Sequence, residues 1–348
     1  MDRKETRRVK IGGVTIGGGA PVAIQSMLNR PSYDIEGSLL QAKSLQEAGC
    51  EIVRAAVPDK AAVQLIAALK EVLAIPVVAD IHFDYRLAIE SVAAGADKIR
   101  INPGNIGEES RVKAVVQACK AREVPIRVGV NSGSLEKEIL KKYGAPTAAA
   151  LAESALFHAS LIERYDYDNI VLALKSSDVA RTIESCRLAR ERCRYPFHLG
   201  VTEAGTRRMG LIKSAVGIGS LLCDGIGDTI RVSLSADPVE EIFAARDILR
   251  ACGMRGGVNV ISCPSCGRTR VAFVPLAEKV EKALAGVQKD ITVAVMGCAV
   301  NGPGEAREAD VGVACGDGCG LLFKKGEILY KVPEEEILPA LLKLIEEC

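Results

Sequence analysis

Ile126-Arg127-Val128-Gly129-Val130-Asn131 is the stretch that decides the fold, because its pattern recurs along the first two-thirds of the chain. Branched apolar residues alternate with Arg127, Gly129 and Asn131. This alternation predicts a β-strand whose two faces meet different surroundings. Seven other runs have the same strand-like character. They span residues 22–27, 52–57, 77–81, 98–103, 170–175, 197–202 and 229–234.

Stretches with helical apolar spacing separate these runs, for example at residues 38–47, 61–73, 109–121 and 178–190. Eight strand–helix units at this spacing predict an α/β fold of the (β/α)8 TIM-barrel type. The alternative is a doubly wound sheet, but no Gly-x-Gly-x-x-Gly turn follows the first strand. A short hairpin at residues 9–20 is expected to close the bottom of the barrel.

A glycine-rich boundary follows the last barrel helix, at Gly253, Gly256 and Gly257. The remaining residues read as a small α+β domain. Its expected strands span 257–261, 291–296, 311–314, 320–323 and 327–332, and its expected helices span 276–285 and 334–346. We therefore predict a TIM-barrel substrate-binding domain over residues 1–252 and a metal-holding domain over residues 253–348.

Composition narrows the class of protein. Hydrophobic residues make up 48% of the 348 and aromatic residues only 4%, an aliphatic profile that suits buried parallel strands. The net charge of +1 argues against nucleic-acid binding driven by bulk charge. The polar N-terminus and the lack of long apolar runs argue against a signal peptide or membrane anchor. Twelve cysteines then indicate the cytoplasm, and metal binding rather than disulfides.

Five cations occur on five different predicted strands, toward their carboxyl ends. They are Arg54, Arg100, Arg127, Lys175 and Arg231. Charges inside a barrel are costly unless they are paired, so this convergence predicts a site for a multiply charged anion such as a phosphate or diphosphate. The alternative is that each cation pairs with a carboxylate on the outside of the barrel.

Further polar residues share a strand face with one another, two positions apart. The pairs are Asp80 with His82, Arg100 with Asn102, and Arg231 with Ser233. Each pair is expected to face the barrel interior. Glu203 follows the seventh strand and is either a proton donor at the mouth or an ion-pair partner. Lys175 also admits a Schiff-base role.

A cysteine motif dominates the last third of the chain: Cys263-Pro264-Ser265-Cys266, then Cys298, then Glu305 beyond a Gly-Pro-Gly turn. Three thiolates at this spacing can hold either structural zinc or a four-iron cluster. Glu305 could supply an exchangeable fourth ligand, which would make the centre catalytic. Alternatively, Cys315 and Cys319 could complete an all-thiolate zinc site.

The predicted topology also bears on assembly. The eighth barrel helix returns the chain to the end of the barrel opposite the mouth. The second domain therefore starts far from the mouth of its own barrel. We expect a head-to-tail homodimer in which each metal domain serves the barrel of the partner.

Together these motifs resemble the family of bacterial 4-hydroxy-3-methylbut-2-enyl diphosphate synthases of the non-mevalonate isoprenoid pathway, in its two-domain form. The likeness covers the whole chain. The motifs are QSM (25–27), IVR (52–54), ADIHF (79–83), IRINPGN (99–105), IRVGVNSGSL (126–135), LALKSSD (172–178), LGVTEAG (199–205), IRVSLSADP (230–238), ISCPSCGRT (261–269) and MGCAVNGPGEA (296–306).

The resemblance implies reductive ring opening of 2-C-methyl-D-erythritol 2,4-cyclodiphosphate, with electrons from a ferredoxin or flavodoxin. It implies a [4Fe-4S] cluster on Cys263, Cys266, Cys298 and Glu305, an acidic role for Glu203, and a homodimer with composite active sites. It assigns substrate contacts to Arg54, Arg100, Arg127, Asn131, Lys175, Arg231 and Ser233. Two other hypotheses remain: a zinc-stapled aldolase acting through Lys175, and a cluster protein for electron transfer alone.

Overall fold

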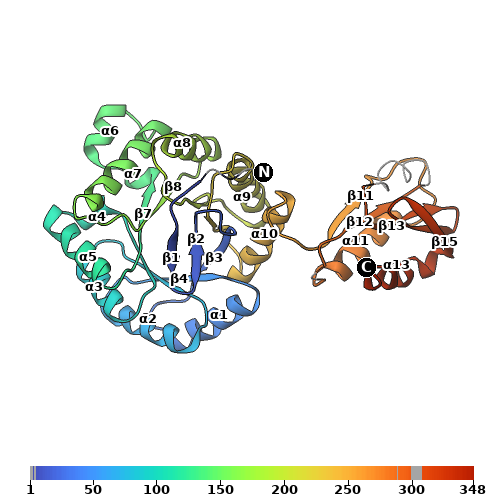
Figure 1. The fold of residues 1–348 in the computed structure, drawn as a ribbon, viewed down its shortest axis with the longest axis horizontal. Helices are drawn as coiled ribbons and strands as arrows, with labels where there is room; N and C mark the ends of the chain where they lie inside the picture. Colours follow the sequence, from blue (N-terminus) through green and yellow to red (C-terminus); the bar gives the residue numbers. More distant parts are fainter. Residues whose placement is uncertain (1–2, 4, 288, 299–307) are drawn as a thin grey trace. The chain divides into compact units, whose positions relative to one another are not determined.

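The computed structural model describes residues 3, 5–287, 289–298 and 308–348 of the chain. Two compact units divide the chain, Met1–Met254 and Arg255–Cys348 (Figure 1). Each unit has its own hydrophobic core. Among the helices of the described residues, none has the length and apolarity needed to cross a membrane.

The first unit is a parallel barrel. Its strands are β3 (Ala23–Met27), β4 (Ile52–Ala56), β5 (Val77–Asp80), β6 (Lys98–Ile101), β7 (Ile126–Asn131), β8 (Ile170–Lys175), β9 (His198–Leu199) and β10 (Thr229–Ile230). They pair in the order β8-β7-β6-β5-β4-β3-β10-β9. An isolated parallel bridge between Leu172 and Phe197 joins the two ends of this sheet. The predicted (β/α)8 barrel is confirmed.

Helices surround the barrel (Figure 1). They are α1 (Ile35–Glu47), α2 (Ala61–Val72), α3 (Tyr85–Ala93), α4 (Pro103–Ile106), α5 (Glu109–Ala121), α6 (Lys137–Tyr143), α7 (Ala148–Glu163), α8 (Val179–Arg192), α9 (Arg207–Cys223) and α10 (Pro238–Ala251). Several begin where an acidic side chain accepts a backbone N–H of the first turn, as Asp34, Asp178 and Asp237 do for α1, α8 and α10. A 3-10 turn, Ser132–Ser134, follows β7.

The N-terminal hairpin closes the end of the barrel where the strands begin. Strands β1 (Val9–Ile11) and β2 (Val14–Ile16) pair antiparallel. Their apolar side chains pack against early residues of four barrel strands. This cluster contains Val9, Ile11, Ile16, Ala23, Ile52, Val78 and Val171. The hairpin therefore plugs the bottom of the barrel, as expected, and any opening must lie at the carboxyl ends of the strands.

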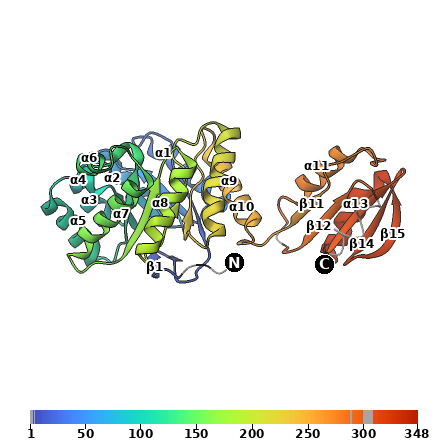
Figure 2. The same cartoon turned by 90° about the horizontal axis from the view of Figure 1, so that it is seen from above.

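The second unit is an α+β domain (Figure 2). Its sheet has the order β11 (Asn259–Ser262), β12 (Thr292–Met296), β13 (Val311–Gly316), β14 (Cys319–Lys324) and β15 (Glu327–Pro333). Strands β11, β12 and β13 pair in parallel, whereas β14 pairs antiparallel with both β13 and β15. Helices α11 (Phe273–Leu284) and α13 (Ile337–Glu346) share one core with this sheet, and a 3-10 turn, Glu334–Glu336, precedes α13.

Two barrel strands are shorter than their sequence pattern predicts. The runs 197–202 and 229–234 form strands of two residues each, β9 and β10. After β9 the backbone turns, and Glu203 adopts a left-handed φ of 51°. The carboxyl ends of these two strands thus become loops, which carry Thr202, Arg231 and Ser233 at the mouth of the barrel.

Candidate functional site

A cavity of about 200 Å³ lies at the carboxyl ends of the barrel strands, and we call it the mouth cavity. Its lining comes from all eight strands or the loops that follow them. The lining residues are Met27, Arg54, Asp80, His82, Arg100, Arg127, Gly129, Asn131, Ala173, Lys175, Thr202, Arg231 and Ser233. All five cations from the sequence pattern lie here, because inward-facing positions of parallel strands converge at this end.

Asp80 is the carboxylate at the centre of these cations. It is 2% exposed and accepts a hydrogen bond from Arg100 Nη1 at 3.0 Å. Arg54 Nε lies 3.6 Å away and His82 Nε2 lies 3.8 Å away. Burial opposes ionisation of Asp80, but Arg54 and Arg100 outweigh it, so the pKa of Asp80 lies well below its usual range. Asp80 therefore stays charged and orients two arginines.

Glu241 is the second buried carboxylate near the mouth, and sequence reasoning missed it. It lies on α10, is 2% exposed, and accepts hydrogen bonds from Arg231 Nη2 at 3.0 Å and from Ser26 Oγ at 3.0 Å. Its spacing could have indicated burial, because Glu241 lies in the apolar stripe of α10, one turn before Ala245. Glu241 fixes the guanidinium of Arg231 from outside the cavity, as it is absent from the lining.

The remaining cations have no carboxylate bonded to them in the described part of the chain. Arg127 is 1% exposed, and its Nε and Nη1 atoms have no hydrogen-bond partner among the described residues. Burial and neighbouring cations lower the pKa of both Arg127 and Lys175 well below the ordinary values. Five cations against two carboxylates leave an excess of positive charge, which suits an anion of more than one charge.

Two glycines make space for the charged side chains. A Cβ atom at Gly129 would lie 2.7 Å from Arg100 Nε, and one at Gly200 would lie 2.8 Å from Lys175 Nζ. Any larger side chain at either position would displace a cation. Gly129 and Gly200 therefore leave the room that the side chains of Arg100 and Lys175 occupy.

Two predicted site residues lie outside the lining of the mouth cavity. Asn102 caps α4, because its Oδ1 accepts the N–H of Gly104 at 3.2 Å and its Nδ2 donates to Ser134 Oγ at 3.1 Å. Glu203 is exposed and directly follows the lining residue Thr202. Strand parity predicted an inward-facing Asn102, and the strand end predicted Glu203 at the mouth, but local capping and a turn place these two side chains outside the lining.

Replacing Asp80 with asparagine should destabilise the barrel by about 3 kcal/mol, because it leaves Arg54 and Arg100 buried without their counter-charge. The folded-state pKa of Asp80 is depressed, so its contribution is present above its unfolded pKa of about 4 and is lost as the pH falls below that. Urea unfolding from pH 7 to pH 3 measures both effects. Asp84→Asn, an exposed carboxylate, is the control. Equal losses in the two variants would contradict the assignment.

The second unit brings three cysteines to one cavity of about 100 Å³. Its lining includes Cys263, Cys266 and Cys298, together with Pro264, Ser265, Arg268, Thr269, Met296 and Gly297. The Gly297 N–H donates to Cys263 Sγ at 3.2 Å, which helps to fix the orientation of that sulfur. Thr269 Oγ1 accepts the N–H of Cys266 at 3.3 Å and so stabilises the turn between the first two cysteines.

The donor set of this cavity is soft, since it consists of three thiols. In the described residues, no group of three or more His, Cys, Asp or Glu side chains is drawn together closely enough for a single metal ion. The three thiols line a shared space, and thiols are the ligands that hold iron–sulfur clusters and structural zinc. The predicted ligand Glu305 lies outside the described residues.

Cys315 and Cys319 do not line the cysteine cavity. Cys315 is fully buried in the core between the sheet and its helices, and burial raises the pKa of its thiol to about 12. It shares one face of β13 with Val311 and Val313, so it packs as a small apolar residue. The structure therefore gives no support to an all-thiolate zinc site that includes Cys315.

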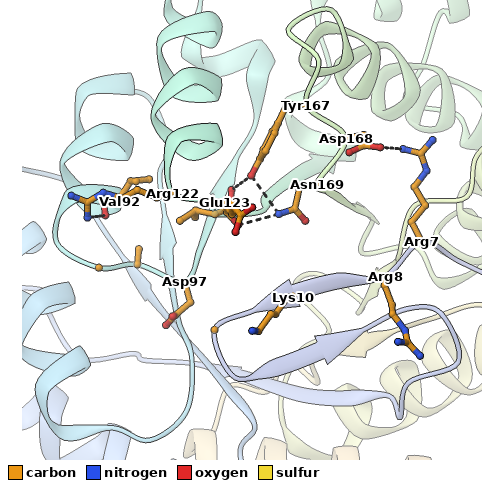
Figure 3. A pocket seen from close by; sticks show the side chains of 14 residues that line it. Arg7, Arg8, Lys10, Val92, Asp97, Arg122, Glu123, Tyr167, Asp168 and Asn169 are labelled. Atoms are coloured by element: carbon orange, nitrogen blue, oxygen red, sulfur yellow. Dashed lines mark hydrogen bonds and ion pairs between the residues drawn. The ribbon is translucent and has the colours of Figure 1, made fainter.

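A separate cavity of about 810 Å³ lies at the opposite end of the barrel (Figure 3). The N-terminal hairpin and the segments before β6, β7 and β8 line it. Several of its charged groups have partners within the fold: Arg7 pairs with Asp168 at 2.6 Å, and Arg122 donates to the carbonyl of Val92 at 3.1 Å. Residues at this end of a TIM barrel generally serve stability, so we assign the candidate site to the mouth.

The fold and its cavities define a TIM-barrel protein with a cation-rich cavity at the mouth of the barrel and a thiol-lined cavity in a second domain. The chain belongs to the GcpE family: the family model of the GcpE TIM-barrel domain matches residues 6–246, and that of the GcpE C-terminal domain matches residues 259–347.

Named relatives match over the full length. A protein from Clostridium perfringens is 56% identical over 347 residues, which is 99% of each chain. One from Geobacter sulfurreducens is 54% identical over 99% of this chain and 98% of its own length. Both are named 4-hydroxy-3-methylbut-2-en-1-yl diphosphate synthase (flavodoxin). Among solved structures, a dihydropteroate synthase from Stenotrophomonas maltophilia covers 71% of this chain and 98% of its own, with a TM-score of 0.51 and 15% identity. That likeness shows the barrel fold alone.

Proposed function

We propose that this chain converts 2-C-methyl-D-erythritol 2,4-cyclodiphosphate to 4-hydroxy-3-methylbut-2-enyl diphosphate, by reductive ring opening with two electrons and loss of water. Its GcpE domains and the names of its relatives support this reaction. The observation that carries the proposal is the convergence of five cations on one mouth cavity. Anaerobic incubation of the cyclodiphosphate with reduced flavodoxin tests it. Formation of the linear diphosphate is expected, and an unchanged cyclodiphosphate would contradict the proposal.

The side chains of the mouth cavity have different roles in the proposed binding of the diphosphate. Arg54, Arg100, Arg127 and Arg231 offer planar pairs of donors that match phosphoryl oxygens, and Lys175 adds a point charge. Asn131 and Ser233 supply neutral hydrogen bonds at the rim. Asp80 and Glu241 hold three of the arginines in place before the substrate arrives, so less ordering is needed on binding. His82 lies beside Asp80 at the opening and is 44% exposed.

The redox centre is assigned to the second unit. We infer that Cys263, Cys266, Cys298 and Glu305 hold a [4Fe-4S] cluster. When bound, this cluster would supply single electrons and a Lewis-acidic iron. Cys266 is exposed, so an electron donor such as flavodoxin or ferredoxin can approach this region closely. Glu203 is the candidate proton donor for the loss of water. All twelve cysteines are free thiols, which is compatible with work in the reducing cytoplasm.

Replacing Glu305 with alanine should leave a coloured protein with little turnover. Three thiolates suffice to retain a cluster, whereas the replaceable carboxylate is the proposed point of access to it. Iron content, the visible absorption spectrum and the rate of product formation measure this. Glu308→Ala, an exposed glutamate three residues further on, is the control. A Glu305→Ala variant with full activity would contradict the exchangeable fourth ligand.

We further propose a head-to-tail homodimer in which each mouth receives the cysteine domain of the partner. Co-expressing an Arg127→Leu chain with a Cys263→Ser chain tests this. In a composite dimer, half of the dimers are mixed, and each mixed dimer holds one intact site. Activity should therefore recover to about one quarter of the wild-type value. If each chain uses its own cysteine domain, no activity will return.

A further inference from the structure

A layer of polar side chains is buried inside the barrel beneath the mouth cavity, and we call it the donor layer. It consists of Gln25, Lys98, Arg127, His198 and Thr229, each at most 1% exposed. Gln25 and Lys98 each precede by two positions a residue that lines the mouth, namely Met27 and Arg100. Residues two apart on a strand share a face and are about 6–7 Å apart, so this layer faces the interior one level deeper.

Two hydrogen bonds lie within the donor layer. Lys98 Nζ donates to Gln25 Oε1 at 3.3 Å, and His198 Nδ1 lies 2.8 Å from Thr229 Oγ1. Four buried atoms remain without a partner among the described residues. They are Gln25 Nε2, Arg127 Nε, Arg127 Nη1 and His198 Nε2. The first three can only donate, and no acceptor is bonded to them among the described residues, whereas His198 Nε2 donates or accepts according to its tautomer.

The positive charges of the donor layer, on Arg127 and on Lys98 when it is protonated, also have no carboxylate bonded to them in the described part of the chain. Asp80 and Glu241, the buried carboxylates nearby, bond to cations of the mouth level, Arg100 and Arg231. Burial, and then the charges of Arg127 and Arg54, lower the pKa of Lys98 well below its ordinary value. An unpaired buried cation costs several kcal/mol, and an unsatisfied buried donor adds to that cost. A water molecule would satisfy the donors alone, whereas an anion satisfies both the donors and the charge.

We propose that the donor layer binds one chloride-sized monovalent anion, held by Lys98, Arg127 and Gln25, beneath the mouth cavity. A small anion is required because Gln25, Lys98 and His198 do not line the mouth cavity and are closed to solvent. The anion would balance the charge of the barrel interior while the mouth is empty. Arg127 belongs both to the donor layer and to the lining of the mouth cavity. The occupancy of the anion site would therefore respond to diphosphate binding in the mouth cavity.

Anomalous diffraction from crystals of the full-length protein grown in bromide in place of chloride tests the site directly. The expected result is a bromide peak within about 3.5 Å of Lys98 Nζ and of the Arg127 guanidinium. A peak only among the mouth residues, a non-anomalous water peak in the donor layer, or no peak there would each overturn the proposal. This measurement needs no variant.

Thermal unfolding in sodium bromide against sodium gluconate, at constant ionic strength, tests the same site in solution. Wild-type protein should show a saturable rise in Tm with bromide, because the folded state alone binds the ion. Lys98→Met should lose that rise and have a higher Tm in gluconate. Lys43→Met, the same substitution at an exposed position on α1, should keep the rise. A Lys98→Met response equal to that of wild type would contradict the assignment.

Discussion

Arg127→Leu is expected to weaken binding of the cyclodiphosphate by about 100-fold or more while leaving the barrel folded. Loss of a buried arginine that contacts a charged phosphoryl group costs about 2–5 kcal/mol of binding free energy, and each 1.4 kcal/mol is a factor of ten. The free energy of unfolding should stay equal or rise. The reason is that leucine removes a fully buried charge whose Nε and Nη1 have no partner among the described residues.

Calorimetric titration with the cyclodiphosphate and urea unfolding measure the two effects of Arg127→Leu together. The matched control is Arg86→Leu, an exposed arginine on α3 that pairs with Asp84 outside the mouth. It should bind the cyclodiphosphate as the wild type does. Unchanged affinity in Arg127→Leu would place the anion site elsewhere, and a large loss of folding stability would mean that Arg127 is a structural group.

Cys263→Ser should abolish both the metal content and the turnover of the protein. Cys263 is the cysteine whose sulfur accepts the Gly297 N–H and lines the shared cavity, so its loss removes one of three proposed thiolate ligands. The cyclodiphosphate should still bind with wild-type affinity, because the barrel is a separate compact unit. Iron and sulfide analysis after anaerobic purification, with calorimetric binding alongside, measures these outcomes.

Cys348→Ser is the matched control for Cys263→Ser. Cys348 is an exposed free cysteine at the end of the chain and does not line the cysteine cavity. This variant should keep its full iron content and turnover. Retention of iron by Cys263→Ser would show that the cluster has other ligands, whereas loss of cyclodiphosphate affinity would show that the effect spreads to the barrel.

Strand periodicity was enough to predict the barrel and the level at which its charges lie. The alternation in residues 126–131 marks β7 to the residue, and the apolar spacing of residues 109–121 marks α5. Inward parity then predicts that cations such as Arg54 and Arg231 meet at one mouth. The strands β9 and β10 are shorter than predicted, because the apolar alternation continues into the loops that follow them.

The partners of the charged groups could not be read from the sequence in the same way. Glu241 lies in a stretch whose pattern is that of an ordinary amphipathic helix. Only the packing of α10 against the barrel brings its carboxylate to Arg231. Lys98 and Gln25 likewise belong to strands whose neighbours are known only once the sheet order is known. Cys315 is a similar case: the sequence left it as a possible zinc ligand, and only the packed structure shows that it shares the core face of β13 with Val311 and Val313.

The most direct test of this account joins the two proposed sites in one measurement. Anaerobically purified protein should contain about four iron and four sulfide atoms per chain. After reduction, its visible absorbance should return when the cyclodiphosphate is added, as the linear diphosphate forms. The Arg127→Leu protein should stay bleached under the same conditions. Colourless wild-type protein that holds zinc, or reduced protein whose absorbance ignores the cyclodiphosphate, would contradict the account.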